Sequence, residues 1–142
     1  MIFMFKVKIL KTKFINDLRR TKEQIKKNVA SDSFEILDII DKHTRPLVPL
    51  ETGRLRQSVM RPNGMLVEKD FLSQEIEYSA RNPRTGYDYA LIQHETPPSI
   101  YHHRVGQWHY LSDGMAESED EVIRLIEKDV DMAMAQTLKG DW

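Results

Sequence analysis

Apolar and polar positions change period along the chain and predict two long helices around a group of short strands. Residues 14–43 place apolar side chains at steps of three, four and seven, with charges between them, which indicates a long amphipathic helix. Small polar residues at 31–33 mark a place where a second helical segment can begin. Residues 118–138 repeat apolar positions every four residues after Ser118-Glu119-Asp120-Glu121, which fits a capping box and predicts a C-terminal helix.

Shorter stretches follow the period of two that is typical of strands. Residues 3–10 alternate in this way and predict a half-buried strand. Residues 58–79 predict antiparallel strands, and Pro62-Asn63-Gly64 indicates a hairpin turn between 58–61 and 65–68. Residues 80–114 show no clean period and predict a loop-rich region with a short helix at 87–93 and a short strand at 107–111.

These elements predict an α+β fold, in which a small antiparallel β-sheet packs against a long N-terminal helix and a C-terminal helix. The length of 142 residues favours a single domain, 1–142. The chain has no cysteine, which excludes disulfides and thiolate zinc sites. The apolar first residues are interrupted by Lys6 and Lys8, too early for a signal peptide or a membrane span, so we expect an intracellular product.

The net charge of −1 hides a polarity along the chain. Residues 1–30 hold nine Lys and Arg against two Asp and Glu, a balance of +7, whereas residues 105–142 hold three against nine, a balance of −6. Opposite charges at the two ends suit a subunit that meets copies of itself through complementary faces. Solvated faces of two helices explain the same pattern. The overall charge is not basic enough for a dedicated nucleic-acid binder.

The segment 49–58, which reads PLETGRLRQS, combines turn-forming residues with two arginines. Prolines at its start end the preceding helix. Thr52 is a good N-cap, Gly53 accepts any backbone conformation, and the residues after it form one helical turn that presents Arg54 and Arg56 outward. The alternative is a polar loop with ordinary solvated arginines.

Four of the five histidines lie within sixteen residues, which raises the possibility of a metal-dependent hydrolase. The candidate ligands are His94, Glu95, His102 and His109. A His-Glu-x-x-His helix would need a histidine where the chain has Pro98, so histidines of a polar interface or of an ordered loop are the alternative. The chain also lacks a nucleophilic cysteine, a Gly-x-Ser-x-Gly turn and a phosphate-binding loop.

Aromatic residues and arginines accumulate in the second half of the chain. They are Tyr87, Tyr89, Tyr101, Trp108 and Tyr110, beside Arg81, Arg84 and Arg104. Such residues stack on single-stranded nucleic acid, and they also anchor protein interfaces. The mixed charge around them favours a protein interface. A small nucleic-acid-binding protein that uses residues 1–30 is a further alternative, with salt-dependent DNA affinity.

Three of these segments together resemble a known family. They are Pro49-x-x-Thr52-Gly53-Arg54-Leu55-Arg56-x-Ser58, Tyr89-Ala90-x-x-x-x-His94-Glu95 and Gly106-Gln107-Trp108-x-Tyr110-Leu111, the last followed by an acidic helix. The chain is similar over residues 15–135 to the minor virion proteins of tailed bacteriophages that complete the tail or join head to tail, including the minor capsid branch. Members usually have a glycine soon after the glutamate, where this chain has Thr96-Pro97-Pro98.

The resemblance implies a structural subunit without catalysis or cofactor, assembled as a homo-oligomeric ring, often of six copies, in the virion neck. The ring would bridge the head connector or adaptor to the tail terminator or tail tube, surround DNA without reading its sequence, and form in the host cytoplasm. We expect its assembly interface to include Thr52, Gly53, Arg54, Arg56, Ser58, Arg81, Arg84, Tyr89, His94, Glu95 and Trp108.

Overall fold

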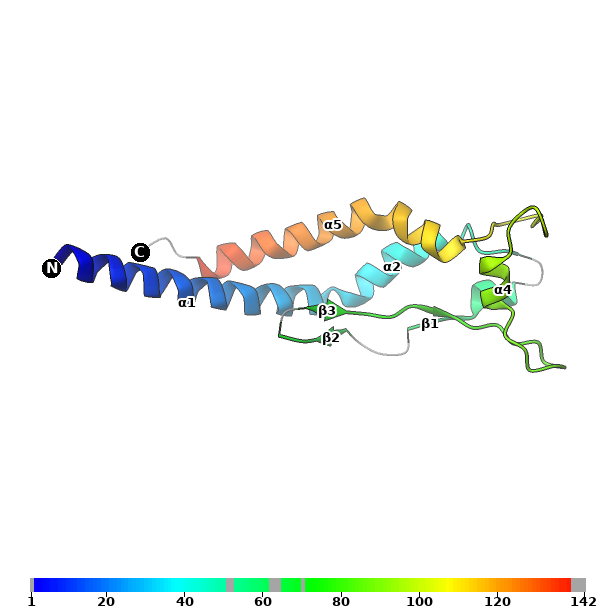
Figure 1. Cartoon of the computed structure of the whole chain (residues 1–142), viewed down its shortest axis with the longest axis horizontal. Helices are drawn as coiled ribbons and strands as arrows, with labels where there is room; N and C mark the ends of the chain where they lie inside the picture. Colours follow the sequence, from blue (N-terminus) through cyan, green and yellow to red (C-terminus); the bar gives the residue numbers. More distant parts are fainter. Residues whose placement is uncertain (1, 51–52, 62–64, 70, 139–142) are drawn as a thin grey trace. The chain divides into compact units, whose positions relative to one another are not determined.

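The computed structural model describes residues 2–50, 53–61, 65–69 and 71–138, with side chains from residue 13 onward (Figure 1). Its elements, in chain order, are α1 (Ile2–Ser31), α2 (Ser33–Thr44), α3 (Arg54–Gln57), β1 (Val59–Met60), β2 (Leu66–Val67), β3 (Leu72–Ser73), β4 (Glu77–Tyr78), α4 (Ala90–Glu95) and α5 (Tyr110–Thr137). The predicted α+β class is confirmed, with a long N-terminal helix, a C-terminal helix and short antiparallel strands. Among the described residues, no helix is both long and apolar enough to span a membrane.

The tertiary contacts group into two compact units. The first comprises Met1–Asp32 and Arg124–Trp142, and the second comprises Ser33–Ile123. The expectation that residues 1–142 form one domain stays a prediction.

In the first unit, α1 and the second half of α5 lie side by side (Figure 1). The Asn28 side-chain amide donates to the Asp129 backbone carbonyl at 3.1 Å, and the hydroxyl groups of Thr21 and Thr137 lie 2.5 Å apart. Buried positions recur every four or eight residues along both helices, as a helix face requires. They are Asp17, Thr21 and Val29 on α1 and Leu125, Asp129 and Ala133 on α5.

The predicted strand at residues 3–10 is wrong, because α1 runs continuously from Ile2 to Ser31. The first glycine or proline of the chain is Pro46, so no helix-breaking residue separates residues 3–10 from the helix predicted at 14–43. One continuous helix can therefore include both segments. Leucine, methionine and lysine are also good helix formers. The predicted break at residues 31–33 is confirmed, since α1 ends at Ser31 and α2 begins at Ser33.

The strands of the second unit form two separate antiparallel pairs. β1 pairs with β4, with Val59 opposite Tyr78, and β2 pairs with β3, with Val67 opposite Leu72. The predicted pairing of 58–61 with 65–68 is therefore wrong, and its turn at 62–64 lies outside the described residues. The antiparallel neighbour of β2 is instead β3, and the Glu68 N–H donates to the Phe71 carbonyl at 2.9 Å beside this pair. Pairing β1 with β4 lets Tyr78 reach the core, which local pattern alone does not show.

Helix α5 begins eight residues earlier than the capping box predicts. It starts at Tyr110, after His109 with its positive φ of 51°, so the predicted strand at 107–111 is wrong. Ser118 is buried inside the helix, where its hydroxyl donates to the Met115 carbonyl at 2.8 Å. The short helix predicted at 87–93 is present as α4, shifted to Ala90–Glu95.

The first half of α5 packs closely on α2 within the second unit. A Cβ added at Gly114 would lie 2.6 Å from the Thr44 Cα, so only glycine fits this crossing. The Glu121 carboxylate lies 2.9 Å from the His43 Nε2 and 3.2 Å from the Lys42 Nζ. Hydrogen bonds from His43 and then Lys42 lower the pKa of Glu121.

Candidate functional site

The three segments that carry the family resemblance share one hydrophobic core. Leu55 comes from the arginine turn, Ala90 from the start of α4 and Tyr110 from the start of α5, and all three are buried in the same cluster. The Tyr110 hydroxyl donates to the Ala90 carbonyl at 2.9 Å. Its ring packs edge-on against Tyr78, with centroids 5.6 Å apart. Burial, followed by the charges of Asp88 and Glu95, raises the pKa of Tyr110, so its hydroxyl remains a donor.

The arginine turn folds as predicted after residue 53. Gly53 has φ 80°, a left-handed conformation that favours glycine, and α3 follows as a single turn. The Ser58 hydroxyl donates to the Leu55 carbonyl at 2.7 Å and so satisfies a helix-end acceptor, while the Leu55 side chain enters the core. Thr52, predicted as the N-cap, lies outside the described residues.

The two arginines of this turn have different surroundings, which corrects the prediction that both point outward. Arg56 is half-buried and turns back on the chain, where its Nε donates to the Val48 carbonyl at 3.0 Å and its Nη2 donates to the Pro46 carbonyl at 3.3 Å. Arg54 is exposed at the surface. The backbone path of residues 46–48 brings two carbonyl groups within reach of the Arg56 guanidinium.

A second contact holds the segment before the turn against the segment before α5. The Gln107 N–H donates to the Leu47 carbonyl at 2.8 Å, and the Leu50 N–H donates to the Val105 carbonyl at 3.2 Å. Between these bonds Gly106 has φ 89°, and a Cβ there would lie 2.6 Å from the Pro49 nitrogen. The first and third resembling segments are thus in backbone contact.

A pocket of about 420 Å³ opens beside the arginine turn, inside the second unit. One wall comes from the turn and the other from the loop after β4 and from α4. The lining residues are Pro49, Gly53, Arg54, Leu55, Asn82, Pro83, Thr85, Tyr87, Tyr89 and Gln93. The side-chain oxygen of Gln93 is buried and has no hydrogen-bond partner among the described residues.

The loop after β4, residues 81–89, is held by Asp88. Its Oδ1 accepts hydrogen bonds from the Ala90 N–H at 3.0 Å and the Ala80 N–H at 3.2 Å, and its Oδ2 accepts one from the Ser79 hydroxyl at 2.8 Å. Burial raises the pKa of Asp88, but these three hydrogen bonds and the charge of Arg81 lower it more, so the net pKa lies below its usual range.

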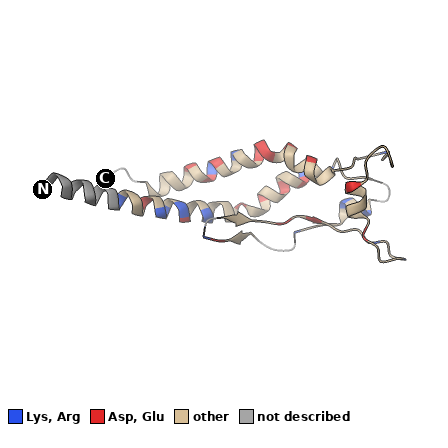
Figure 2. Cartoon of the chain, viewed as in Figure 1, with Lys and Arg blue, Asp and Glu red and all other residues tan. Residues whose placement is uncertain are grey.

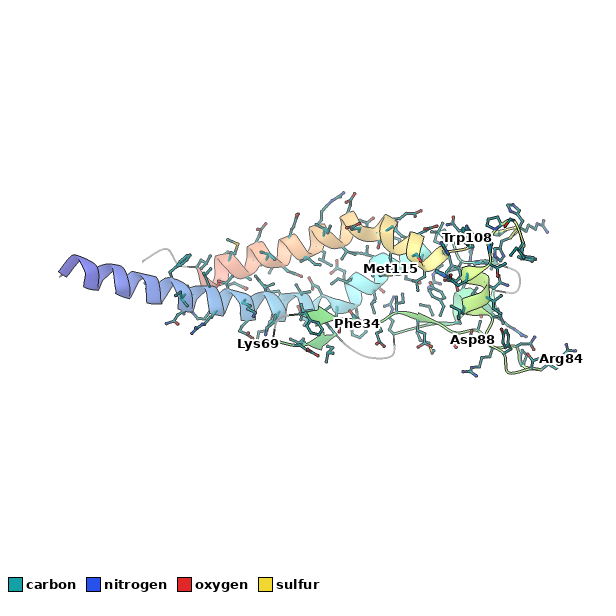
Figure 3. The ribbon with its side chains drawn as sticks, viewed as in Figure 1. Phe34, Lys69, Arg84, Asp88, Trp108 and Met115 are labelled. Carbon is teal, nitrogen blue, oxygen red and sulfur yellow. The ribbon has the colours of Figure 1, made fainter. Side chains whose placement is uncertain are left out.

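The predicted interface residues of this loop lie at its surface and at its base. Arg84 is exposed at the outer end of the loop, and Asp88 lies nearer α4 (Figure 3). Arg81 is also exposed, and its Nη1 lies 3.5 Å from the Gly86 carbonyl. Tyr89 is half-buried and packs against the hydrophobic core while lining the pocket.

His94, Glu95 and His109 lie together at the end of α4. The His94 Nδ1 is 2.5 Å from one Glu95 oxygen, and the His109 Nε2 is 3.8 Å from the other. Trp108 stacks on His109 with ring centroids 3.9 Å apart. The Ser112 hydroxyl lies 3.2 Å from the His94 Nε2, so both ring nitrogens of His94 have protein neighbours.

The structure does not gather the full set of predicted metal ligands. His102 is exposed, and among the described residues no hydrogen bond, ion pair or ring contact joins it to His94 or His109. In the described part of the chain, no group of three or more His, Cys, Asp or Glu side chains is placed to hold a metal ion. His103 is buried against Tyr101, with ring centroids 4.9 Å apart, and neither of its ring nitrogens has a hydrogen-bond partner among the described residues.

The sequence interpretation missed two residues that shape the site. Asp88 lies two residues before Ala90, the first residue of α4, and its side chain accepts a hydrogen bond from the Ala90 N–H. An aspartate just before a helix is a recognised sequence signal for such a cap. Asn82 accepts hydrogen bonds from the Arg84 N–H at 2.9 Å and the Thr85 N–H at 3.4 Å, and Asn-Pro is a known turn signal. Both signals lie in the segment interpreted only as a loop.

Comparison of the chain with protein-family models, curated proteins and solved structures found no match. The family resemblance of the three segments therefore stays a prediction, and the function follows as a proposal.

Proposed function

We propose that the chain is a structural protein of a tailed-bacteriophage virion, a neck or tail-completion subunit whose ring joins the head connector to the tail. One observation carries the proposal. Leu55, Ala90 and Tyr110 come from the three resembling segments and lie in one buried cluster, although long stretches of chain separate them. The three resembling segments therefore meet at one place in the second unit, as an assembly site built from all three requires.

Exposed apolar side chains in the second unit support a role in assembly. Leu91 on α4 is 68% exposed, Ile100 in the following loop is 77% exposed, and Tyr87 is 59% exposed. Large apolar and aromatic side chains at a surface favour protein contacts, because burying them in an interface removes apolar area from water. A ring subunit would cover such residues with its neighbours.

The distribution of charge in the second unit fits a head-to-tail ring. Residues 110–123 contain five acidic residues and no lysine or arginine, and Figure 2 shows them along the first half of α5. The loop after β4 carries Arg81 and Arg84 instead. A ring made by rotation needs two different surfaces that complement each other, and opposite charges supply that complementarity.

The partners follow from this placement in the virion. The ring, for which we expect six copies, would contact the head connector or adaptor on one side and the tail terminator or tail tube on the other. DNA would pass through its lumen, and the contacts there would be independent of sequence.

The proposal is tested in a phage that carries this gene. A nonsense mutation should give filled heads and complete tails that remain separate in electron micrographs, and the wild-type protein supplied from a plasmid should restore joining. A nonsense mutation at a capsid gene serves as the control and should remove heads altogether. Normal yields of joined, infectious virions from the mutant would contradict the proposal.

A metal-dependent hydrolase that uses the histidine cluster is the alternative that the sequence raised. Its support is weaker, because no group of three or more His, Cys, Asp or Glu side chains in the described part of the chain is placed to hold a metal ion. Metal analysis of the purified chain after exposure to zinc or manganese and dialysis separates the two. Bound metal in a one-to-one ratio that is lost in His94→Ala would favour the hydrolase. A ring-sized species in light scattering without bound metal would favour the neck subunit.

A further inference from the structure

We propose that the pocket beside the arginine turn receives acidic side chains from α5 of a second copy of the chain, and that this contact links neighbouring subunits. The inference rests on the proposed ring and adds which two surfaces meet. Four observations carry it: the chemistry of the pocket walls, their fixed geometry, the charge of the surrounding loop and the acidic surface of α5.

The walls of the pocket suit a carboxylate on a flexible side chain. Arg54 supplies a guanidinium, whose planar fork matches the two oxygens of a carboxylate. Tyr87 and Tyr89 also line the pocket, and a tyrosine side chain combines an apolar ring with a hydroxyl group that can form hydrogen bonds. A volume of about 420 Å³ holds side chains rather than a folded element.

The pocket is formed before any partner binds. On one wall the Gln57 N–H donates to the Gly53 carbonyl at 3.1 Å. On the other, the Asn82 N–H donates to the Tyr87 carbonyl and the Gly86 N–H donates to the Asn82 carbonyl, both at 2.8 Å. Walls that are already ordered reduce the entropy lost on association, so a small contact can contribute useful affinity.

The loop that forms one wall adds positive charge at the pocket rim. Arg81 and Arg84 are exposed on either side of the wall residues Asn82 and Pro83, and Arg84 lies at the outer end of the loop (Figure 3). Among the described residues, the Arg84 guanidinium has no ion-pair partner. Such a rim attracts acidic surfaces and repels basic ones, including the basic first unit of another copy.

The first half of α5 offers the matching acidic surface. Glu117 and Asp120 are exposed and three residues apart, which places them on one face of the helix. Glu119 is exposed as well, and none of the three forms an ion pair with a described residue. The same segment contains no lysine or arginine that would compete with the pocket for these acids.

Cysteine cross-linking tests the contact directly, because the native chain has no cysteine. A Thr85→Cys chain is mixed with a tagged Asp120→Cys chain under mild oxidation, and the mixed disulfide is measured on a non-reducing gel. The control replaces Asp120→Cys by Glu35→Cys, an exposed acid on α2. We expect about tenfold more mixed disulfide than in the control, the enrichment that a contact of about 1.4 kcal/mol gives.

Charge reversal distinguishes the proposed contact from chance proximity. Arg54→Glu in the Thr85→Cys chain should reduce the cross-link to the control level, and Glu117→Lys in the Asp120→Cys chain should restore it. Equal cross-linking of the test and control pairs would overturn the inference. Loss of the cross-link on addition of short duplex DNA, reversed by salt, would also overturn it, because the pocket would then bind phosphates. Rings seen in electron micrographs without the cross-link would overturn this contact and leave the proposed function standing.

Discussion

The Tyr110 hydroxyl donates a hydrogen bond of 2.9 Å to the backbone carbonyl of Ala90, and both residues are buried. This bond joins the first residue of α5 to the first residue of α4. Helix α4 contributes Gln93 to the pocket wall, and α5 carries the acidic residues of the proposed contact. The bond therefore connects the two helices that contribute to the proposed contact surfaces.

Tyr110→Phe should lower the free energy of unfolding by about 1–2 kcal/mol, because the ring stays packed while a buried hydrogen bond is lost. Urea denaturation followed by circular dichroism measures the change. Tyr87→Phe is the matched control, since Tyr87 is 59% exposed, and should alter stability by less than about 0.5 kcal/mol. Equal effects of the two substitutions would contradict a stabilising role for the Tyr110 hydroxyl.

Gly114→Ala should destabilise the chain although alanine favours helices. In an open helix position this change adds about 0.5–1 kcal/mol of stability. Here the new Cβ would lie 2.6 Å from the Thr44 Cα, so α2 and α5 must separate. Overpacking of this kind costs about 1–3 kcal/mol.

Thermal unfolding of Gly114→Ala gives the sign of this effect. Glu119→Ala, at an exposed position of the same helix, controls for helix propensity and should leave the midpoint nearly unchanged. Thr44→Ser should not rescue Gly114→Ala, because the closest carbon belongs to the backbone. A midpoint that rises in Gly114→Ala would show that α2 and α5 do not approach this closely.

Local signals predicted the parts of the fold that depend on neighbouring residues. The break between α1 and α2 falls at the small polar residues 31–33, and α3 follows Gly53 as the turn chemistry indicates. The alternation at residues 3–10 was misleading because a pattern of only eight residues is too short to distinguish a strand from the first turns of a long helix. The capping box at Ser118 was misleading because a serine inside a helix can bond the carbonyl three residues before it.

The missed features depend on contacts between residues that lie far apart in the sequence. β1 pairs with β4, and Tyr78 of β4 is buried in the core, but a local hairpin signal at 62–64 cannot reveal a pairing between distant residues. The difference between Arg54 and Arg56 depends on where the backbone places the carbonyl groups of Pro46 and Val48. The residue types of the site were therefore predictable, but their separate roles were not.

Arg54 and Arg56 should respond differently to substitution. Arg56→Lys should lower the free energy of unfolding by about 1 kcal/mol, because a single ammonium replaces a guanidinium that donates to two carbonyl groups. Arg54→Lys should change stability by less than about 0.5 kcal/mol, because Arg54 is exposed. Urea denaturation of both variants under one set of conditions makes the comparison. Destabilisation by Arg54→Lys that matches or exceeds that of Arg56→Lys would contradict the separation of roles.

Asp88 should make stability depend on acid pH. Its pKa is lower in the folded chain than in the unfolded chain, because the hydrogen bonds from Ala90, Ser79 and Ala80 outweigh the opposing effect of burial. The contribution of the Asp88 carboxylate to the free energy of unfolding is therefore complete above the ordinary aspartate pKa of about 4. This contribution is lost as the pH falls through the lowered pKa that Asp88 has in the folded chain. Asp88→Asn keeps the shape and removes the charge.

The Asp88→Asn chain should accordingly be less stable than wild type at pH 7. The difference should begin to shrink as the pH falls below about 4, because Asp88 is then protonated first in the unfolded wild-type chain and only at a lower pH in the folded chain. Urea midpoints measured from pH 7 to pH 3 test this. Glu119→Gln makes the same acid-to-amide change at an exposed position and should show no such trend. A stability difference for Asp88→Asn that stays constant with pH would mean that the loop depends on hydrogen-bond geometry and not on the charge of Asp88.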